Sequence, residues 1–487
     1  MLVMKKYKIF AFISIICVLT ACSESFLDKA PMGDVSDAAF WKTSADLESA
    51  VNGIYYVIRD RDARNIAQFW PFAANIPLND MQTTSYGDVV DMANMKWNST
   101  NLWLNCIWNA MYMGATRANV VISRGSKMDN IDATFKDIKI GEAKFLRGFY
   151  YLMLVRAYGD VPLLLEEQTD ATILPTRTPK VDVLAQIVKD FTEAAAVLPA
   201  SWNDANKGRA TKGTAIGYLA IANLYQEDWD AAITNSEAIF DLNQYSLLTN
   251  QKDLYKWGNE NTSESLFECQ FRDATTDGHF MEYFLEPTIA TAAMGCDPNG
   301  WGVLYPSNQF RAAFEPGDKR RWQILSKGET LELIGGITFT MDSTSATPNG
   351  LACAKYWVGR LPSNNSPDQN IILLKFSEVI MNYAEALANK SRFADAYAQI
   401  NRIRNRSGLP NKATINEIEA CIQDINKERR IENFWDENGW FDLTRTKQAK
   451  KFLLDTYGIT MPDQNYLYPI PQTELNLNPN LTQNLGY

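Results

Sequence analysis

The sequence predicts a mainly α-helical fold of helical hairpins, with long decorating loops and a few short β segments. Three observations predict this class. Residues 141–158 carry apolar positions at helical spacing, residues 214–242 and 375–406 each repeat the pattern of two packed helices, and the chain between these two segments is rich in Gly, Pro, Asn, Asp and Ser.

Residues 141–158 (GEAKFLRGFYYLMLVRAY) form a predicted amphipathic helix. Apolar side chains recur there every three or four residues and make one broad face. These side chains are Ala143, Leu146, Phe149, Tyr150, Met153, Leu154 and Ala157. Gly159 and Pro162 follow, and this order of Gly and then Pro predicts that the helix ends before Gly159.

Residues 214–242 and 375–406 both fit the spacing of a tetratricopeptide repeat, which is a hairpin of two helices. Small side chains stand in each segment where the two helices must approach closely. They are Ala220, Ala232, Ala384 and Ala396. The two matches predict a scaffold of stacked helical hairpins.

Residues 243–374 break the helical pattern with clusters such as DPNGWGVLYPSNQF and RLPSNNSPDQN. Short β segments are expected at about 331–341 and 351–358. A second loop region rich in aromatic residues runs from Gln68 to Trp108. Because long loops on a rigid scaffold usually carry the recognition surface, we expect a binding site there.

The first 22 residues have the pattern of a lipoprotein signal. Lys5, Lys6 and Lys8 precede an apolar run that ends in Thr20-Ala21-Cys22. The pattern predicts that residues 1–21 are removed and that Cys22 is acylated, which gives a strong membrane anchor. The alternatives are a plain secretory signal with a chance cysteine, or a spanning helix, for which the apolar run is too short.

Charge and composition exclude several function classes. The formal charge is −10 and becomes −13 without residues 1–21, which contain three lysines and no acidic residue. An acidic surface binds phosphate backbones poorly, so we expect no nucleic-acid partner. His279 is the single histidine, and no phosphate-cradling Gly-rich loop occurs. We therefore expect no metal, no cofactor and no catalytic triad; a glycosidase, which needs only two carboxylates, stays open.

Four segments in order resemble the SusD/RagB family of surface lipoproteins, which capture nutrients for an outer-membrane transporter. The first holds Phe26-Leu27-Asp28, Phe40-Trp41 and a helix from Asp46 to Arg59. The others read EAKFLRGFYYLMLVRAYGDVP, NKERRIENFWDENGWFDLTRT and YPIPQTELNLNPNLTQNLGY. The resemblance spans nearly the whole mature chain. It implies a fold of tetratricopeptide-like hairpins, a SusC-like TonB-dependent transporter as partner, and a glycan as the usual ligand.

This resemblance also implies one SusD-like domain over residues 22–487. Its helical scaffold is expected at about 40–242 and 375–450, its loop-rich ligand-binding part at about 243–374, and a docked tail at 451–487. The charged residues of the third segment are interpreted as a structural charge network and not as catalytic groups. They are Glu428, Arg429, Arg430, Glu432, Asp442 and Arg445.

A neutral sugar is bound by flat aromatic rings that stack on its C–H face and by polar side chains that bond its hydroxyls. Two regions fit this chemistry. The first holds Trp70, Asn79, Asp80, Tyr86 and Trp97, where Asn79-Asp80 takes the place of a Ser-Asp pair of the family. The second holds His279, Tyr283, Trp301, Tyr305 and Asn308.

For the other tryptophans, the local sequence indicates whether the ring is expected in the core or at the surface. Trp103 and Trp108 share one face of a predicted helix and are expected in the core. Trp301 lies between Gly300 and Gly302, so we expect its ring to be exposed. The local sequence does not indicate whether Trp257, Trp322 and Trp357 are buried or exposed.

The sequence thus predicts a non-catalytic glycan-binding lipoprotein of the outer membrane, facing the cell exterior and attached only through its lipid anchor. A peptide-binding member of the same family and a glycoside hydrolase are the alternatives.

Overall fold

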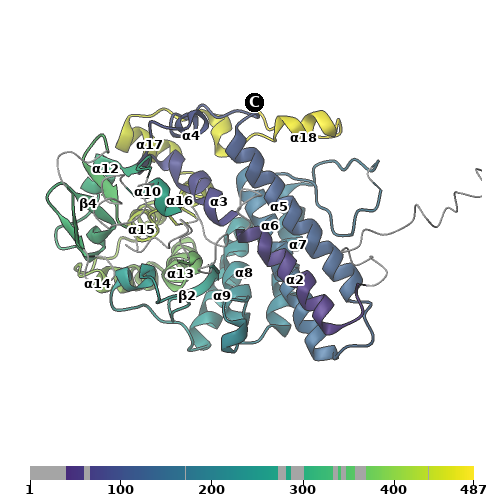
Figure 1. Cartoon of the computed structure of the whole chain (residues 1–487). Helices are drawn as coiled ribbons and strands as arrows, with labels where there is room; N and C mark the ends of the chain where they lie inside the picture. Colours follow the sequence, from purple (N-terminus) through teal and green to yellow (C-terminus); the bar gives the residue numbers. More distant parts are fainter. Residues whose placement is uncertain are drawn as a thin grey trace, which may run out of the picture.

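The structure is a computed structural model that describes residues 40–59, 66–170, 172–271, 281–286, 301–332, 338–341, 347–356, 369–436 and 438–487. Its main body is a set of long helices, with short strand pairs gathered on the opposite side (Figure 1). The predicted signal segment and Cys22 lie outside the described residues, as does His279.

The long helices α2, α5, α6, α7, α8 and α9 pack in sequence order, with α2 against both α5 and α6 (Figure 1). Their bounds are Ser44–Arg59, Leu102–Val120, Ala133–Tyr158, Lys180–Val197, Lys212–Gln226 and Trp229–Asp241. Helix α5 continues into a π-helical turn, η3 (Val121–Gly125). Helix α6 confirms the predicted helix but begins earlier, at Ala133. It ends as expected, because Gly159 caps it at φ 75°, a conformation that suits glycine.

Both predicted hairpins are confirmed. The first pairs α8 with α9, and the second pairs α13 (Phe376–Asn389) with α14 (Phe393–Arg406). The small residues Ala220, Ala232, Ala384 and Ala396 are all buried at the crossings. Helix α13 also packs on α8 and α9, so the two hairpins stack although residues 242–375 separate them in the sequence.

The described strands form four antiparallel pairs. They are β1 (Met81–Gln82) with β3 (Tyr305–Pro306), β2 (Ser265–Cys269) with β8 (Ile371–Lys375), β4 (Ile324–Ser326) with β7 (Leu351–Cys353), and β5 (Thr330–Glu332) with β6 (Thr338–Thr340). The predicted segment at 331–341 is the β5–β6 hairpin. The segment predicted at 351–358 is shorter in the structure and ends at Cys353.

Shorter helices and 3-10 turns make up the rest of the described secondary structure. The α-helices are α3 (Ile66–Asn75), α4 (Gly87–Ala93), α10 (Met281–Leu285), α12 (Asn308–Ala312), α15 (Ile418–Glu432), α16 (Gly439–Arg445), α17 (Ala449–Tyr457) and α18 (Gln472–Leu477). The 3-10 turns are η2 (Ile76–Leu78), η4 (Asp204–Asn206), η5 (Gln251–Tyr255), η6 (Lys319–Gln323) and η8 (Asp463–Tyr466).

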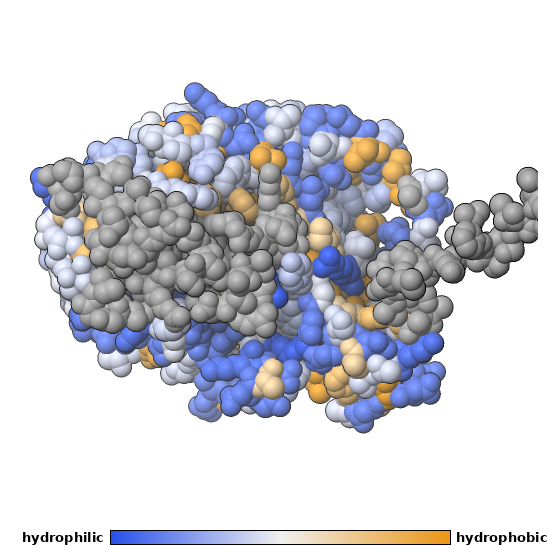
Figure 2. Space-filling view, viewed as in Figure 1, coloured by the Kyte–Doolittle hydropathy of each residue, from blue (hydrophilic) through white to orange (hydrophobic). Residues whose placement is uncertain are grey.

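The C-terminal tail lies against the scaffold. The amide of Tyr468 donates to the carbonyl of Ala157 at 2.7 Å, and the Trp97 indole N–H donates to the Tyr487 hydroxyl at 2.6 Å. Hydrophilic residues cover much of the described surface in the view of Figure 2. Within the described part of the chain, no helix combines the length and apolar character that crossing a membrane requires.

The predicted charge network is confirmed as a buried structural cluster. Glu385 of α13 accepts hydrogen bonds from Arg429 of α15 and Arg445 of α16, so one carboxylate joins three helices. Burial alone would raise the pKa of Glu385, but Arg445 and Arg429 outweigh it and lower the pKa to about 2. Glu428 likewise lies between Arg320 and Arg404.

Two helical glycines provide a matched test of the scaffold. A Cβ at Gly114 of α5 would lie 2.3 Å from the Tyr150 ring of α6, whereas a Cβ at Gly53 of α2 meets nothing within 4 Å. We expect Gly114→Ala to lower the free energy of unfolding by about 1 to 3 kcal/mol through overpacking. Gly53→Ala should be neutral or raise it by up to about 1 kcal/mol. Chemical denaturation of both variants measures this; equal effects would contradict the close α5–α6 crossing.

Candidate ligand-binding site

The two predicted binding regions meet in the structure. Strand β1 pairs with β3, so that Gln82 lies opposite Tyr305 and Met81 lies opposite Pro306. The amide of Ser307 extends this contact by donating to the carbonyl of Asp80 at 2.8 Å. Segments more than 200 residues apart therefore form one surface.

Asp80 anchors this surface to the scaffold. Its buried carboxylate accepts from Arg430 of α15, with Nε–O distances of 3.0 and 2.9 Å and an Nη2–O distance of 2.6 Å. The Tyr457 hydroxyl donates to the same carboxylate, and burial together with the Asp80 charge raises the pKa of Tyr457. The guanidinium of Arg430 also lies over the Phe452 ring at 4.9 Å.

Asn79 and Asp80 thus differ from the expectation that they face a ligand. Asn79 has a left-handed backbone, with φ 60°, and its side-chain amide donates to the carbonyl of Ala93 at 2.9 Å. Both residues are buried. Their polar groups hold the loop in place, because internal partners already use them.

Trp70, Trp97 and Tyr305, which the sequence analysis expects to contact a ligand, are also buried. Trp70 stacks on Phe441 with ring centroids 4.6 Å apart. Trp97 is covered by the tail through its bond to Tyr487, and Tyr305 is buried where β3 pairs with β1. The expectation that Trp103 and Trp108 are core residues is confirmed.

Among the side chains of the two regions that the structure describes, the exposed aromatic residues are Tyr86 and Trp301. The exposed fractions are 45% for Tyr86 and 41% for Trp301, so the predicted exposure of Trp301 is confirmed. Both rings pack edge-on against Phe284 of α10, with centroid distances of 6.0 Å and 5.0 Å. Phe284 is buried and rests on Phe72. We call Tyr86, Trp301 and Phe284 the aromatic platform.

The backbone of Tyr86 is held in an unusual conformation at the start of α4, with φ 63° and ψ 95°. Positive φ is uncommon for a bulky residue and concentrates at functional sites. The carbonyl of Tyr86 accepts from the amides of Val89 and Val90, so the first turn of α4 fixes this conformation. The fold thereby presents the ring at the surface instead of burying it.

Several polar residues are close in sequence to the aromatic residues of the platform. Gln82, Thr83 and Ser85 precede Tyr86 and are partly exposed, and Asn308 is exposed at the start of α12. Hydroxyl and amide groups both donate and accept hydrogen bonds, as sugar hydroxyls do. Tyr283 belongs to α10 by its backbone, but its side chain lies outside the described residues, as His279 does.

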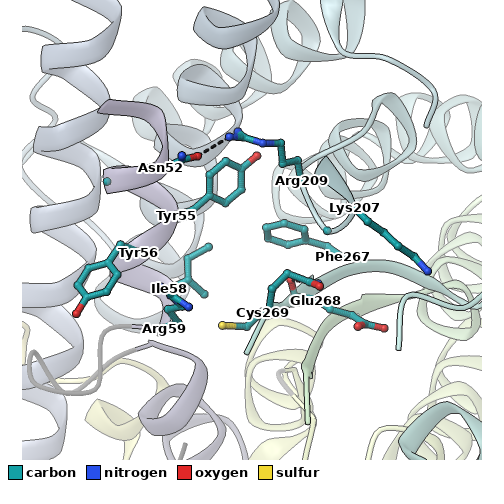
Figure 3. A pocket seen from close by; sticks show the side chains of 13 residues that line it. Asn52, Tyr55, Tyr56, Ile58, Arg59, Lys207, Arg209, Phe267, Glu268 and Cys269 are labelled. Atoms are coloured by element: carbon teal, nitrogen blue, oxygen red, sulfur yellow. Dashed lines mark hydrogen bonds between the residues drawn. The ribbon is translucent and has the colours of Figure 1, made fainter. Parts of the chain in front are cut away.

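A cavity of about 510 Å³ lies elsewhere, between α2, residues 207–209 and β2 (Figure 3). None of the predicted site residues lines it. The Tyr55 hydroxyl donates to Glu142 at 2.8 Å, and Arg209 pairs with Glu48 and Glu142 and bonds Asn52. Burial lowers the pKa of Arg209 to about 10. Most polar groups that line this cavity therefore bond to other groups of the protein. One aromatic residue of the lining, Tyr56, is 40% exposed.

Two family models match the chain on either side of residue 300. The model described as "SusD family" matches residues 303–487, and the model described as "Starch-binding associating with outer membrane" matches residues 25–224. The chain belongs to the SusD family.

Relatives and solved structures of SusD-like proteins cover nearly the full length. "SusD-like protein P2" of Formosa agariphila is 29% identical over 521 residues, which cover 99% of each chain. A SusD-like protein from Bacteroides fragilis has the same fold, with a TM-score of 0.81 and 23% identity over 94% of this chain and all of that one. A solved structure described as a "Laminarin binding SusD-like protein" has a TM-score of 0.76 and 24% identity, and covers 92% of this chain and all of that one.

Phe284 is the part of this candidate site that sequence reasoning missed. It is the residue after Tyr283 in a segment without clear periodicity, so only the tertiary contact shows that it supports both exposed rings. Among the tryptophans that the sequence left open, Trp257 and Trp322 are both half-buried, and Trp357 lies outside the described residues.

The Asp80 ion pair gives a prediction that separates anchoring from ligand contact. Asp80→Asn should lower the free energy of unfolding by about 3 kcal/mol, because it leaves the charge of Arg430, whose side chain is only 14% exposed, without its carboxylate partner. The matched control is Asp395→Asn, which breaks the exposed pair with Arg392 and should cost under about 1 kcal/mol. Denaturant unfolding of both variants measures the loss. If Asp80→Asn lowers the free energy of unfolding no more than Asp395→Asn does, the anchoring role is contradicted.

Proposed function

We propose that this SusD-family protein is a non-catalytic cell-surface glycan-binding lipoprotein that delivers oligosaccharide to a SusC-like TonB-dependent transporter. The observation that carries the proposal is the aromatic platform. Tyr86 and Trp301 come from distant loops, are both exposed, and share the buried Phe284 as their base.

The platform suits a neutral sugar for a physical reason. Exposed aromatic rings offer flat apolar faces to the C–H groups of a sugar ring, and their buried base limits the entropy lost on binding. The nearby hydroxyl and amide side chains supply hydrogen bonds that set orientation. One matching family model is described as starch-binding and one structural neighbour as laminarin-binding, and both support the same ligand class.

A hydrolytic role has less support. A glycosidase needs two accessible carboxylates that face the scissile bond. The carboxylates of Asp80, Glu385, Glu428 and Glu432 are buried and paired with arginine or lysine. Groups held in this way do not exchange protons with a ligand, which favours binding over catalysis.

Trp301→Ala tests the platform. By analogy with base stacking, one aromatic ring contributes roughly 1 to 3 kcal/mol, which corresponds to about five- to more than 100-fold weaker binding. The free energy of unfolding should change by about 1 kcal/mol or less, because 41% of Trp301 is exposed and its ring meets Phe284 only edge-on. A glycan array first identifies the ligand, with a laminarin oligosaccharide as the first probe, and calorimetry and denaturation are then run on the same preparation.

Tyr56→Ala is the matched control, since Tyr56 is a similarly exposed aromatic residue at the other cavity. We expect its glycan affinity to equal that of the unmodified protein. If Tyr56→Ala weakens binding and Trp301→Ala does not, the glycan site is the cavity of Figure 3. Tight binding of peptides on a companion array, without glycan binding, would favour the peptide-binding alternative.

Cys22→Ala tests the anchor and the partner together. The proposal makes acylated Cys22 the only direct attachment to lipid, so the variant should leave the membrane fraction of cells that lack the transporter. In cells that contain the transporter, part of the variant should stay with the membrane and be extracted with the barrel in mild detergent. Sedimentation with the membrane in the absence of the transporter would contradict the anchor, and equal release from both cell types would contradict the partnership.

A further inference from the structure

A second cavity, of about 970 Å³, lies where the C-terminal ends of α6, α8 and α16 meet the start of α7. The start of α15 and the tail residues 483–485 complete its wall. Its volume lies within the usual range of small-molecule sites. It shares no lining residue with the aromatic platform.

Three cations surround one tyrosine ring in this cavity. Lys180 Nζ lies 5.3 Å from the centroid of the Tyr225 ring, Arg445 Cζ lies 5.3 Å from it, and Arg156 Cζ lies 5.6 Å from it. Arg156 Nε also donates to the Tyr225 hydroxyl at 3.1 Å. Each cation is attracted by the ring. Arg445 is also paired with Glu385 and Asp442, so its charge is partly compensated and repels Lys180 less than an unpaired charge would.

Lys447 and Arg177 add two further positive charges to the same wall. Among the described residues, no carboxylate oxygen lies within 4.0 Å of the amine of Lys180 or of Lys447. Burial lowers the pKa of Lys180, and the charges of Arg445 and Lys447 lower it further. We call Lys180, Lys447, Arg445 and Tyr225 the cation pocket.

Several carboxylates of the cavity wall are used elsewhere. Asp160 accepts from the backbone amide of Lys180 at 2.7 Å, and Glu385 is shared by Arg429 and Arg445. Glu417 accepts from the amides of Glu419 and Ala420 at the start of α15. Glu227 and Glu419 also line the wall. The charges of Glu227 and Asp160 raise the pKa of Lys180, but each raises it less than Arg445 or Lys447 lowers it.

The start of α7 carries the partial positive charge of a helix N-terminus, which the Asp160 carboxylate partly offsets through its hydrogen bond from the Lys180 amide. Lys180 is the first residue of this 18-residue helix, and Pro179 before it gives no side-chain cap. The N-terminal end of a helix carries partial positive charge. An anion placed between Lys180 and Lys447 would offset this charge and the repulsion among the side chains.

We propose that the cation pocket binds the carboxylate or sulfate group of a small polar solute, with Lys180 and Lys447 as the contacting groups. Tyr225 then acts as a positioning residue that holds Lys180 against its ring. Trp229 lines the same cavity and offers an aromatic surface to the body of the solute. This anion site goes beyond the proposed glycan function and does not depend on it.

The test measures binding of sodium glucuronate, sodium sulfate and neutral glucose by calorimetry, at one constant ionic strength. We expect saturable binding of an anion and none of glucose. Lys180→Gln and Lys447→Gln should each weaken anion binding by about tenfold or more, since each removes a charge-assisted hydrogen bond. Lys180→Arg, which keeps the charge, should retain most of the affinity. Lys252→Gln is the matched control, because Lys252 is exposed on η5 and lies outside the cavity.

Equal affinity for glucuronate and sulfate would support recognition of a free oxyanion, and tighter binding of glucuronate would support recognition of an anionic sugar. Lys447 is exposed, so Lys447→Gln keeps the test valid if Lys180→Gln fails to fold. Absence of saturable anion binding, or anion binding unchanged in both lysine variants, would overturn the proposal. Trp301→Ala should bind these anions like the unmodified protein, so failure of the glycan site and failure of the anion site are distinguishable.

Discussion

The Asp80 carboxylate lies between Arg430 and Tyr457, and this contact connects the loop before Tyr86 to helix α15. A buried ion pair adds little net stability when its desolvation is counted, but removal of one partner is costly. The pair therefore selects one arrangement of the loop. Because β1 follows Asp80 directly and pairs with β3, this arrangement also places the second loop region.

Helix α15 can serve as an anchor because it is itself held by buried charges. Arg429 joins it to Glu385 of α13, and Glu428 and Glu432 join it to Arg320, Arg404 and Arg406. A helix fixed on several sides passes little motion to a loop attached to it. The aromatic platform is thus rigid through a chain of contacts that begins in the helical scaffold, which favours binding with a small entropic cost.

Local sequence was enough to predict helix α6 and the two helical hairpins, but not α3, α4 and the start of α5, which occupy the region expected to be a loop. The α8–α9 and α13–α14 pairs follow from the spacing of small and apolar residues within about 30 residues, and Gly159 marks the end of α6. The exposure of Trp301 was also predictable, because its flanking glycines give the ring no neighbouring side chains for cover.

Burial of the other expected site residues was not predictable, because their partners are distant in the sequence. Trp97 is covered by Tyr487, 390 residues away, and Asp80 is paired with Arg430, 350 residues away. The local sequence around an aromatic residue in a polar loop does not show whether the C-terminal tail buries the ring or the ring is exposed to solvent. Phe284 and the cation pocket likewise exist only through tertiary contacts.

The central claim is that a glycan stacks on the aromatic platform, and fluorine NMR tests it most directly. The protein is labelled with 5-fluorotryptophan, and the Trp301 resonance is assigned with Trp301→Phe. On titration with the oligosaccharide chosen by the array, the account predicts that the Trp301 resonance shifts to saturation while those of buried Trp70 and Trp97 stay in place. A Trp301 resonance that stays unchanged at saturating glycan, while that of another tryptophan shifts, would contradict it.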